Sequence, residues 1–526
     1  MANYKVLIAS AGIGSRVENY SKNFNKALIS VGRKPAICYI IDKIPKDVEI
    51  VVTVGYKKDY LVQFLSLVYA DRKIKFVDVD KFAGEGSGLG YSILKAKDEL
   101  QCPFIFIAND CITDEEFTEP THNFMNFSIE QDTTEYRTMK LQRMSSVVSE
   151  LIQKGDRRSS NAAYIGLCGI YNYNEFWKYM VDGVEDGSIE QGESYAISKM
   201  LNAGMHFNGY PSTWYDTGNV SKYIATNKHF SKDDRINILD KEDETIWFID
   251  DKVVKFHNDK TFISQRVKRT QVLGKFVPEI LGSTENMYMY KRVDGDTFTY
   301  NLQYDKFEKF LGWIKDFWSE RELNETENEK FRTVCKKFYY DKTMERVNEY
   351  YKKYNREDSV EIINGKRYDK LSDILNRVPW ETLINTAKPT NFHGDLHFEN
   401  ILVNKDSFSM LDWRQSFGGI IEYGDIHYDL AKLKHGMIIS HEMVDAELYN
   451  TQIDGNVINF YFMRKNVLSE IEKKFDVFIK EQGYNLKQIN ILTALIYLNA
   501  AALHRHPYND LLYYLGKTML SDILDE

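Results

Sequence analysis

Three side chains toward the end of the chain have the types and spacing of a phosphoryl-transfer site. Asp395 precedes Asn400 by five residues, and Asp412 ends the apolar, strand-like run that follows. A carboxylate at the substrate hydroxyl, with an amide and a second carboxylate that bind Mg²⁺, is the set of groups that phosphoryl transfer from ATP requires. The spacing therefore predicts a kinase site with one base and two metal ligands on adjacent loops.

A glycine-rich turn near the start of the chain has the features of a triphosphate-binding loop. Ala11, Gly12 and Gly14 follow an apolar run and precede a predicted helix, and the cations Arg16 and Lys26 come next. Backbone N–H groups of such a turn bind phosphate oxygens, while nearby cations neutralise their charge. An ordinary tight turn is the alternative interpretation of the glycines.

Two aspartates that lie far apart in the sequence each stand at the end of an apolar run. Asp110 follows the strand-like run 104–109, and Asp216 lies in the segment 214–218. Carboxylates in such positions suit an Mg²⁺ ion that bridges phosphate oxygens. Capping of a helix is the alternative role for either residue.

The elements that must position these groups change in character along the chain. Runs such as Lys5–Ser10, Glu49–Val54 and Pro103–Ala108 alternate with helical segments up to about residue 230. This rhythm predicts an α/β fold with a Rossmann-like, doubly wound, mostly parallel sheet. The polar stretch Ser231–Asp240 interrupts it, so we predict that a first domain ends there.

Beyond this point the pattern becomes β-rich and then helical. Strand-like runs at Thr245–Ile249 and Lys252–Phe256 precede a predicted helix at Thr261–Leu273 and further strand signal at 286–293. Later apolar residues recur at the spacing of one buried helix face, as at Phe331 and Val334. The predicted domains are therefore 1–231, a linker at 232–240, and 241–526, the last divided into a small lobe (241–297) and a helical lobe (298–526).

The first domain resembles the sugar-phosphate nucleotidyltransferases. The spacing of Arg16 and Lys26 carries this resemblance, which continues over about 230 residues, although Asn25 stands where the family usually has proline. The resemblance implies further roles along the domain. The residues concerned are Gly86, Ser87 and Gly88 for the nucleobase, Asp110 and Asp216 for the metal ion, Lys154 for the acceptor phosphate, and Glu193 for acceptor hydroxyls. Gln153 and Gly155, which flank Lys154, differ from the family's motif. A surface lysine is the alternative interpretation of Lys154, and an exposed carboxylate at a helix start is the alternative for Glu193.

The second domain resembles the aminoglycoside phosphotransferase and choline kinase superfamily, whose site reads HGDxxxxN and then (I/L)DW. The resemblance implies that Asp395 orients the hydroxyl and accepts its proton, that Asn400 and Asp412 hold Mg²⁺, and that His393 braces the loop. It also implies a lysine on a small-lobe strand that contacts ATP phosphates, for which Lys255 is favoured over Lys252. Further residues are implied less specifically. These are Tyr290 in the adenine hinge, Trp413 toward the substrate, and Asp425 and Asp429 in stabilising the lobe. Arg414, directly after the metal motif, is a candidate for contact with a substrate phosphate, and an ion pair with a neighbouring acid is the alternative; a surface or packing role is expected for His397.

Composition excludes several other classes of protein. The net charge is −9 with no block of like charge, which disfavours nucleic-acid binding and a polybasic membrane patch. Five scattered cysteines suit reduced, core-filling thiols, and the apolar stretch at 491–503 is too short and too polar to cross a membrane. We therefore expect a cytoplasmic enzyme with small-molecule substrates; the sequence leaves its oligomeric state open.

The two resemblances fit together because the product of a kinase is the substrate of a nucleotidyltransferase. The sequence predicts that ATP and Mg²⁺ serve the first step, and that a second nucleoside triphosphate, CTP or UTP, serves the next. The expected product is an NDP-activated building block, with a sugar favoured and used for surface polysaccharide such as capsule. A choline or ethanolamine kinase fused to a phosphocholine cytidylyltransferase is the main alternative, with Trp313, Trp318, Trp380 and Trp413 as candidates for an aromatic cage. A regulatory pseudoenzyme and an antibiotic-modifying kinase are weaker alternatives.

Overall fold

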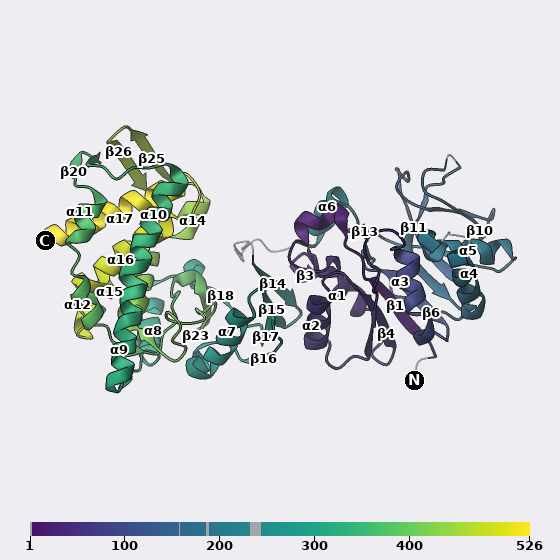
Figure 1. Ribbon diagram of the computed structural model, residues 1–526, viewed down its shortest axis with the longest axis horizontal. Helices are drawn as coiled ribbons and strands as arrows, with labels where there is room; N and C mark the ends of the chain where they lie inside the picture. Colours follow the sequence, from purple (N-terminus) through teal and green to yellow (C-terminus); the bar gives the residue numbers. More distant parts are fainter. Residues whose placement is uncertain (1–2, 157, 186–188, 232–242) are drawn as a thin grey trace. The chain divides into compact units, whose positions relative to one another are not determined.

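The computed structural model describes residues 3–156, 158–185, 189–231 and 243–526 (Figure 1). The chain forms two compact units. Unit 1 comprises Met1–Lys260 and Leu281–Tyr290, and unit 2 comprises Thr261–Ile280 and Lys291–Glu526.

A nine-stranded sheet forms the centre of unit 1. β1 (Lys5–Ser10) pairs in parallel with β4 (Glu49–Val54) on one side and with β6 (Phe104–Ala108) on the other, and β5 (Ile74–Asp78) pairs in parallel with β4. Beyond β6 the sheet becomes antiparallel through β11 (Ala162–Ile170). The remaining strands are β8 (Phe124–Ile129), β9 (Thr138–Leu141), β10 (Val148–Ile152) and β12 (Asn208–Pro211).

Helices cover both faces of this sheet, because its central strands are apolar on both sides. In β1, Val6 and Ile8 belong to one hydrophobic cluster and Leu7 to another, as the alternation of side chains along a strand requires. The first cluster includes residues of α2 (Lys58–Val68), and the second includes residues of α4 (Tyr173–Glu185) and α5 (Glu193–Asn202). The predicted doubly wound α/β fold is confirmed. The other helices of the unit are α1 (Ala36–Ile41), α3 (Leu89–Lys95) and α6 (Val220–Phe230).

A second sheet has the order β14-β15-β17-β16 and follows the predicted strand positions. Trp247 on β14 and Phe256 on β15 lie in the same hydrophobic cluster as Phe24 and Phe64 of the first sheet's flank. The strands that we assigned to a small lobe at 241–297 are therefore mostly grouped with unit 1, because their apolar faces share its core. The predicted linker at 232–240 lies outside the described residues. The strands are β14 (Glu244–Ile249), β15 (Lys252–His257), β16 (Ile280–Ser283) and β17 (Met287–Lys291).

Unit 2 is mainly helical, with small sheets around its loops. Its longer helices are α7 (Lys260–Leu273), α8 (Tyr304–Lys315), α9 (Glu325–Lys336), α10 (Lys342–Tyr354), α13 (Ile426–Ile438), α15 (Asn466–Glu481), α16 (Leu486–Ala501) and α17 (Tyr508–Asp525). Its sheets are β18 (Asp296–Thr297) with β22 (Ile401–Asn404) and β23 (Ser407–Met410); β19 (Glu361–Ile363) with β20 (Lys366–Tyr368), β25 (Tyr449–Asp454) and β26 (Val457–Phe462); and β21 (Pro389–Thr390) with β24 (Gly424–Asp425).

The apolar stretch near the C-terminus forms α16, most of whose side chains are buried within unit 2. Within the described residues, the length and hydropathy that a membrane-crossing helix needs are not found together in any helix. The five cysteines form no disulfide, and four of them are buried, as predicted for core-filling thiols.

Candidate active sites

Five of the residues predicted for the first site line one pocket of unit 1. The pocket has a volume of about 130 Å³ and lies at the carboxyl ends of the central strands. Arg16, Asp110, Lys154, Glu193 and Asp216 all line it. Residues from separate segments of the sequence thus meet at the end of an open parallel sheet, where such folds bind ligands.

Lys26 and Asp110 form a partly buried ion pair at this pocket, with 2.7 Å between Nζ and Oδ2. The residue before the lysine explains its position. Asn25 Nδ2 donates to the carbonyl oxygens of Ser10 (2.9 Å) and Tyr56 (2.8 Å), and its Oδ1 accepts the N–H of Ala27 at 2.9 Å. Asparagine therefore fixes the loop through side-chain hydrogen bonds at the position where the resembling family usually has proline.

Replacement of Asn25 by alanine is expected to destabilise unit 1. The change leaves two buried carbonyl oxygens and one N–H without this partner, at a cost of about 2–4 kcal/mol. Denaturant unfolding followed by fluorescence measures the loss, with Asn202→Ala, an exposed position at the end of α5, as the control. Equal midpoints for the two variants would contradict the role of Asn25.

Asp110 and Asp216 face a common point beside Gly218. A Cβ atom placed on Gly218 would lie 2.8 Å from Asp216 Oδ1 and 3.2 Å from Asp110 Oδ2, so only glycine leaves this space open. Asp216 also accepts hydrogen bonds from Gly218 N (2.6 Å) and from the Tyr136 hydroxyl (2.9 Å). Burial, and then the charge of Asp110, raise the pKa of Asp216. A divalent cation would relieve this repulsion between carboxylates, and the donor set fits Mg²⁺.

The pKa of Asp110 moves in the opposite direction from that of Asp216. Burial favours its neutral form, but the charges of Lys26 and Arg16 outweigh burial and lower the pKa. Asp110 is therefore ionised at neutral pH.

Lys154 and Glu193 bring opposite charges to the far side of the pocket. Burial, followed by repulsion from Arg137 and Arg16, lowers the pKa of Lys154. Burial raises the pKa of Glu193, although Arg137 opposes this effect. In the described part of the chain, Glu193 Oε2 has no hydrogen-bond partner. A buried, unsatisfied carboxylate oxygen near a cation suits an acceptor molecule that has both hydroxyl groups and a phosphate.

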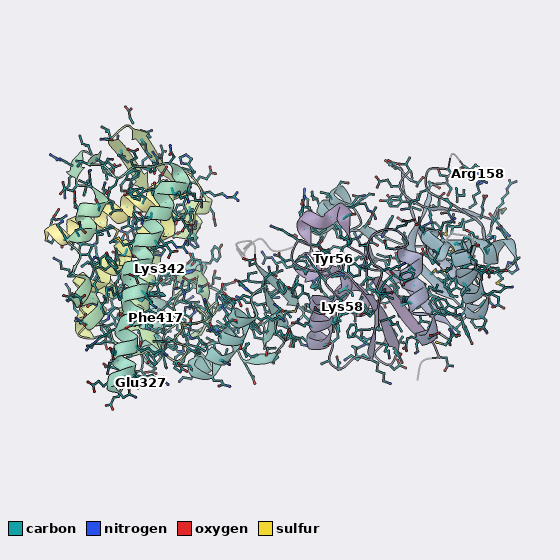
Figure 2. The ribbon with its side chains drawn as sticks, viewed as in Figure 1. Tyr56, Lys58, Arg158, Glu327, Lys342 and Phe417 are labelled. Carbon is teal, nitrogen blue, oxygen red and sulfur yellow. The ribbon has the colours of Figure 1, made fainter. Side chains whose placement is uncertain are left out.

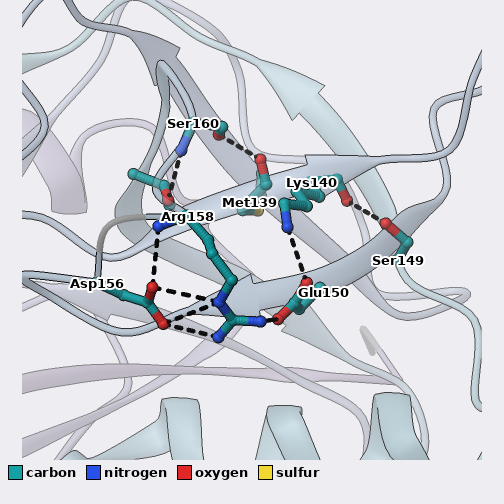
Figure 3. A network of polar contacts seen from close by, with 8 residues as sticks. Met139, Lys140, Ser149, Glu150, Asp156, Arg158 and Ser160 are labelled. Carbon is teal, nitrogen blue, oxygen red and sulfur yellow. Dashed lines mark hydrogen bonds and ion pairs between the residues drawn. The ribbon is translucent and has the colours of Figure 1, made fainter.

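The loop that contains Lys154 is fixed by a network on the β9–β10 hairpin (Figure 3). Arg158 Nη2 lies 2.7 Å from Asp156 Oδ2, and its Nη1 lies 2.8 Å from Glu150 Oε1. Lys140, on the adjacent strand, pairs with the same Glu150 at 3.2 Å. The two exposed ion pairs of Arg158 stabilise the loop only modestly, but the pair with Glu150 holds the loop against β10.

The predicted phosphate and nucleobase loops are turns with glycine at strained positions. Gly14 has a φ of +72°, and a Cβ atom there would lie 2.8 Å from the Lys26 side chain. Gly86 also has a positive φ, and the Ser87 hydroxyl donates to the carbonyl of Gly84. Around Gly12 the space is open, and Gly88 precedes α3. Ala11 is buried. These turns leave backbone groups accessible, but their contacts with a nucleotide stay a prediction.

The catalytic loop of unit 2 joins Asp395, His397 and Asn400 in one polar cluster. Asn400 Nδ2 donates to the main-chain oxygen of Asp395 at 2.9 Å, so its Oδ1 remains for a metal ion. His397 Nε2 lies 3.6 Å from Asp395 Oδ2, and its Nδ1 lies 2.8 Å from Glu399. Lys432 on α13 lies 2.8 Å from Asp395 Oδ1. Burial alone would raise the pKa of Asp395, but Lys432 and His397 hold it well below its usual range.

Asp412, the second predicted metal ligand of unit 2, has a left-handed backbone with a φ of +58°. Its Oδ1 lies 2.6 Å from Nη1 of Arg266 on α7. A second arginine of the same helix, Arg269, donates to the carbonyl oxygens of Phe392 and Arg414, and so joins the segment before Asp395 to the segment after Asp412. A strained residue held by such contacts is typical of functional sites.

Trp413 does not line a substrate site in this structure. The side chain is only 1% exposed, and its indole N–H donates to the carbonyl oxygen of Arg266 at 3.0 Å. The prediction that it contacts the substrate, or forms an aromatic cage, fails because the ring fills the core behind Asp412. Arg414, in contrast, is half-buried and lies over the ring of Phe338, 5.2 Å from its centroid.

The bracing role of His393 agrees with its contacts. Its Nδ1 accepts the N–H of Asp395 at 3.2 Å, and its Nε2 lies 2.9 Å from the carbonyl oxygen of Leu411, which fits a neutral ring protonated at Nε2. Asp429 accepts the N–H groups of His393 and Gly394, each at 2.7 Å. Asp425 likewise accepts the N–H of Lys388, so both aspartates stabilise the lobe as predicted.

A pH dependence of stability follows from His393. Burial lowers its pKa from 6.5 to about 3. Because the unfolded state binds the proton first, the stability that the neutral ring provides is complete above pH 6.5 and is lost as the pH falls toward 3. Between pH 7 and pH 5 the loss should be about 2 kcal/mol. Unfolding measured at both pH values should show a smaller loss for His393→Gln than for His229→Gln, an exposed control, and equal losses would refute the assignment.

Lys255 and Tyr290 are buried strand residues of unit 1. Lys255 Nζ lies 3.8 Å from Glu244 Oε1 on the neighbouring strand. The predicted helix at 261–273 contains no acid that could pair with this lysine, and Glu244 on the neighbouring strand lies beside it instead. Tyr290 lies on β17 and is 5% exposed.

Several residues at the two sites were missed by sequence reasoning. Arg137, Tyr136 and Trp214 line the first pocket, and Lys432 and Arg266 contact the kinase aspartates. Only Trp214 lay within a recognised motif. Tyr136 and Arg137 lie just before β9, and Lys432 and Arg266 lie on helices; none of the four belongs to a motif that assigns it a role.

Comparison with known proteins assigns both regions. Residues 330–456 match the model of a family described as "Phosphotransferase enzyme family". The Bifunctional protein GlmU of Methanococcus vannielii is 26% identical over 248 residues, which cover 45% of this chain and 56% of the relative. The Choline-phosphate cytidylyltransferase of Streptococcus pneumoniae is 30% identical over 132 residues, which cover 24% of this chain and 53% of the relative. The chain thus spans about half the length of the curated relatives it matches.

Solved structures with similarity to the chain include two nucleotidyltransferases. CTP:phosphocholine cytidylyltransferase from Streptococcus pneumoniae (LicC) has a TM-score of 0.38 and 20% identity, and the match covers 43% of this chain and 99% of that one. A putative glucose-1-phosphate thymidylyltransferase from Bacillus anthracis has a TM-score of 0.39 and 20% identity, covering 45% and 98%.

The sequence matches define the class of the protein. The N-terminal region resembles nucleotidyltransferases, and a segment of the C-terminal region matches the phosphotransferases, so both resemblances inferred from the motifs are confirmed. Each of the two regions thus resembles a different kind of transferase.

Proposed function

We propose that the chain is a bifunctional enzyme that phosphorylates a small hydroxylated metabolite with ATP and then couples the product to a second nucleoside triphosphate. One observation carries the proposal. Each compact unit has its own set of acids and cations: Asp110, Asp216 and Lys154 in unit 1, and Asp395 and Asp412 in unit 2. Two separate sites with this chemistry suit two consecutive phosphoryl reactions.

In the kinase step, Asp395 orients the substrate hydroxyl and accepts its proton as the oxygen attacks the γ-phosphorus of ATP. Its carboxylate stays ionised because Lys432 and His397 are close. His393 fixes the loop through its bonds to Asp395 N and Leu411 O. ADP leaves with the electrons of the broken phosphorus–oxygen bond.

In the nucleotidyl step, the phosphate of the acceptor attacks the α-phosphorus of the second triphosphate, and pyrophosphate leaves. Arg16 and Lys26 neutralise the triphosphate, and Lys154 binds the acceptor phosphate. The side chains position the reactants and stabilise charge, so no covalent intermediate is needed.

Mg²⁺ fits both sites as the cofactor. Asp110 and Asp216 would hold it in unit 1, and Asn400 and Asp412 in unit 2. Among the described residues no group of three or more His, Cys, Asp or Glu forms a complete metal site. Oxygen atoms of the substrate phosphates and water would complete the coordination, as is usual for Mg²⁺. The bound ion supplies charge neutralisation to the phosphoryl groups.

A sugar is the acceptor that the first pocket favours. The unsatisfied Glu193 Oε2 and the buried indole N–H of Trp214, which has no partner within the described chain, together offer one acceptor and one donor to hydroxyl groups. The product would then be an NDP-sugar, made with CTP or UTP in the cytoplasm for surface polysaccharide such as capsule.

A phosphorylated amino alcohol is the second candidate acceptor. The rings of Tyr136 and Trp214 meet edge to face, with centroids 4.9 Å apart, and line the pocket with Glu193. Two aromatic rings and a carboxylate suit a quaternary ammonium group. One curated relative is named for choline phosphate, which agrees with this alternative.

Product analysis tests the proposal. The full chain is incubated with ATP, each nucleoside triphosphate, Mg²⁺ and a panel of sugars and amino alcohols, and the products are identified by mass spectrometry. We expect one panel member to be recovered as its monophosphate and as its nucleoside diphosphate derivative. If neither product forms with any member of a broad panel, the two-step function is rejected.

A further inference from the structure

Three cations from separate segments of unit 2 lie near Tyr428 or near the loop that contains Asp395. Lys432 lies on α13, Arg414 follows Asp412 by two residues, and Lys342 begins α10. Lys432 is neutralised by Asp395, at 2.8 Å. Lys342 and Arg414 have no carboxylate within ion-pair distance in the described part of the chain.

A local irregularity of the helix positions Lys342. α9 and α10 are joined by a π-helical turn, η7 (Lys337–Asp341), and π-turns within helices often mark functional sites. Phe338 in this turn packs against Phe417, with centroids 4.5 Å apart, and Figure 2 labels both Lys342 and Phe417. The irregular turn thus brings a ring and a cation to the catalytic loop.

The two unneutralised cations share one aromatic platform. Lys342 Nζ lies 4.5 Å from the centroid of Phe338 and 6.0 Å from that of Tyr428, and the guanidinium of Arg414 lies 5.2 Å from the centroid of Phe338. Both charges therefore gather around one ring beside the Asp395 loop. Cation–π contacts compensate only part of the cost of gathering like charges.

The pKa of Tyr428 reflects the same excess of positive charge. Burial raises the pKa of this tyrosine, yet Lys342, Arg414 and Lys432 together lower it below its ordinary value, although Asp395 opposes them. Burial also lowers the pKa of Lys342, and Arg414 and Lys432 lower it further. Arg346, another nearby cation, is paired with Glu349.

We propose that Lys342 and Arg414 form an oxyanion subsite of the kinase, which binds a phosphate or carboxylate group beside the hydroxyl that Asp395 orients. The inference rests on the kinase activity proposed above. The oxyanion is either a group that the acceptor already has or the phosphoryl group in transfer. If the oxyanion belongs to the acceptor, a quaternary ammonium acceptor is disfavoured, because two unneutralised cations would repel it.

Steady-state ADP release by the full chain tests the subsite. Acceptors are neutral hexoses, hexuronic acids, hexose monophosphates and choline. Lys342→Met keeps the apolar stem and removes the charge, Lys342→Arg restores charge, and Lys337→Met, an exposed lysine of the same turn, is the matched control. Binding of inorganic phosphate, measured by calorimetry without nucleotide, gives a readout that needs no turnover.

The outcomes separate the sources of the anion. If it belongs to the acceptor, Lys342→Met raises KM for the anionic acceptor at least about 10-fold and leaves KM for ATP unchanged. If it is the transferred group, kcat falls about 10-fold or more with every acceptor. Either result supports the subsite when Lys342→Arg recovers and phosphate binding weakens only in Lys342→Met. Phosphate binding and kinetics equal to those of Lys337→Met would overturn it, and efficient turnover of choline would reject the case in which the acceptor carries the anion. A chain that binds phosphate through Lys342 but phosphorylates nothing would reject the proposed kinase activity and retain the subsite.

Discussion

Asp395→Asn is expected to abolish ATP-dependent phosphorylation and leave nucleotidyl transfer from a supplied phosphorylated acceptor nearly intact. Asparagine keeps the size of the side chain but cannot accept the proton of the hydroxyl, and loss of a positioned base lowers the rate about 10²–10⁴-fold. The change also leaves Lys432 without its partner at 2.8 Å, which adds a smaller cost to stability. Separate assays of ADP and pyrophosphate release measure the two steps.

Asp406→Asn is the matched control for this experiment. Asp406 lies six residues beyond Asn400, is exposed, and pairs with Lys309 on the surface, an interaction that contributes little to stability. Both activities should survive in it. If a correctly folded Asp395→Asn chain loses both activities, the two sites are not independent.

Much of the first site could be predicted because its residues end strands of a regular sheet. A parallel sheet brings the ends of β1 and β6 to one edge, so the glycine turn and Asp110 had to meet there. Lys26 and Asp216 joined them through motifs whose spacing is recognisable. The predicted bounds of β1 and β4 agree with the structure, since both strands are apolar on two faces.

The residues that sequence reasoning missed act across long separations. Lys432 contacts Asp395 from α13, a helix whose apolar residues indicate burial but no contact with the loop at 393–400. Arg266 binds Asp412, which is 146 residues away in the sequence. Trp413 illustrates the opposite error. Its position beside a predicted metal ligand suggested contact with substrate, but its ring is buried in the core and its indole N–H is bonded to Arg266.

The domain boundary shows a third limit. The strands of the predicted small lobe have apolar faces, and the sequence does not indicate whether the core of the first or of the second domain buries them. Trp247 packs beside Phe24 and Phe64, and its indole N–H donates to Ser30 at 3.1 Å. These strands are therefore grouped with the nucleotidyltransferase-like unit, even though the order of motifs along the chain assigned them to the kinase.

The pocket of unit 1 leads to a second prediction with a large expected effect, this time on nucleotidyl transfer. Asp110 Oδ2 is 2.7 Å from Lys26 Nζ and close to the point beside Gly218 that Asp216 also faces. Asp110→Asn removes one of the two carboxylates proposed to hold Mg²⁺ and leaves the cation of Lys26 without its partner. Asparagine preserves the shape, so the change tests charge rather than packing.

We expect Asp110→Asn to lower nucleotidyl transfer about 10²–10³-fold, since each preorganised group that meets developing phosphate charge is worth roughly 3–4 kcal/mol. Kinase turnover should persist, so the phosphorylated intermediate should accumulate while pyrophosphate release stops. Asp114→Asn is a suitable control, because that carboxylate is exposed and accepts only the Tyr215 hydroxyl at 2.9 Å. Raising the Mg²⁺ concentration should recover part of the activity of Asp110→Asn, because the remaining ligand, Asp216, still binds the ion weakly. Unchanged pyrophosphate release at low Mg²⁺ would show that Asp110 does not hold the metal ion.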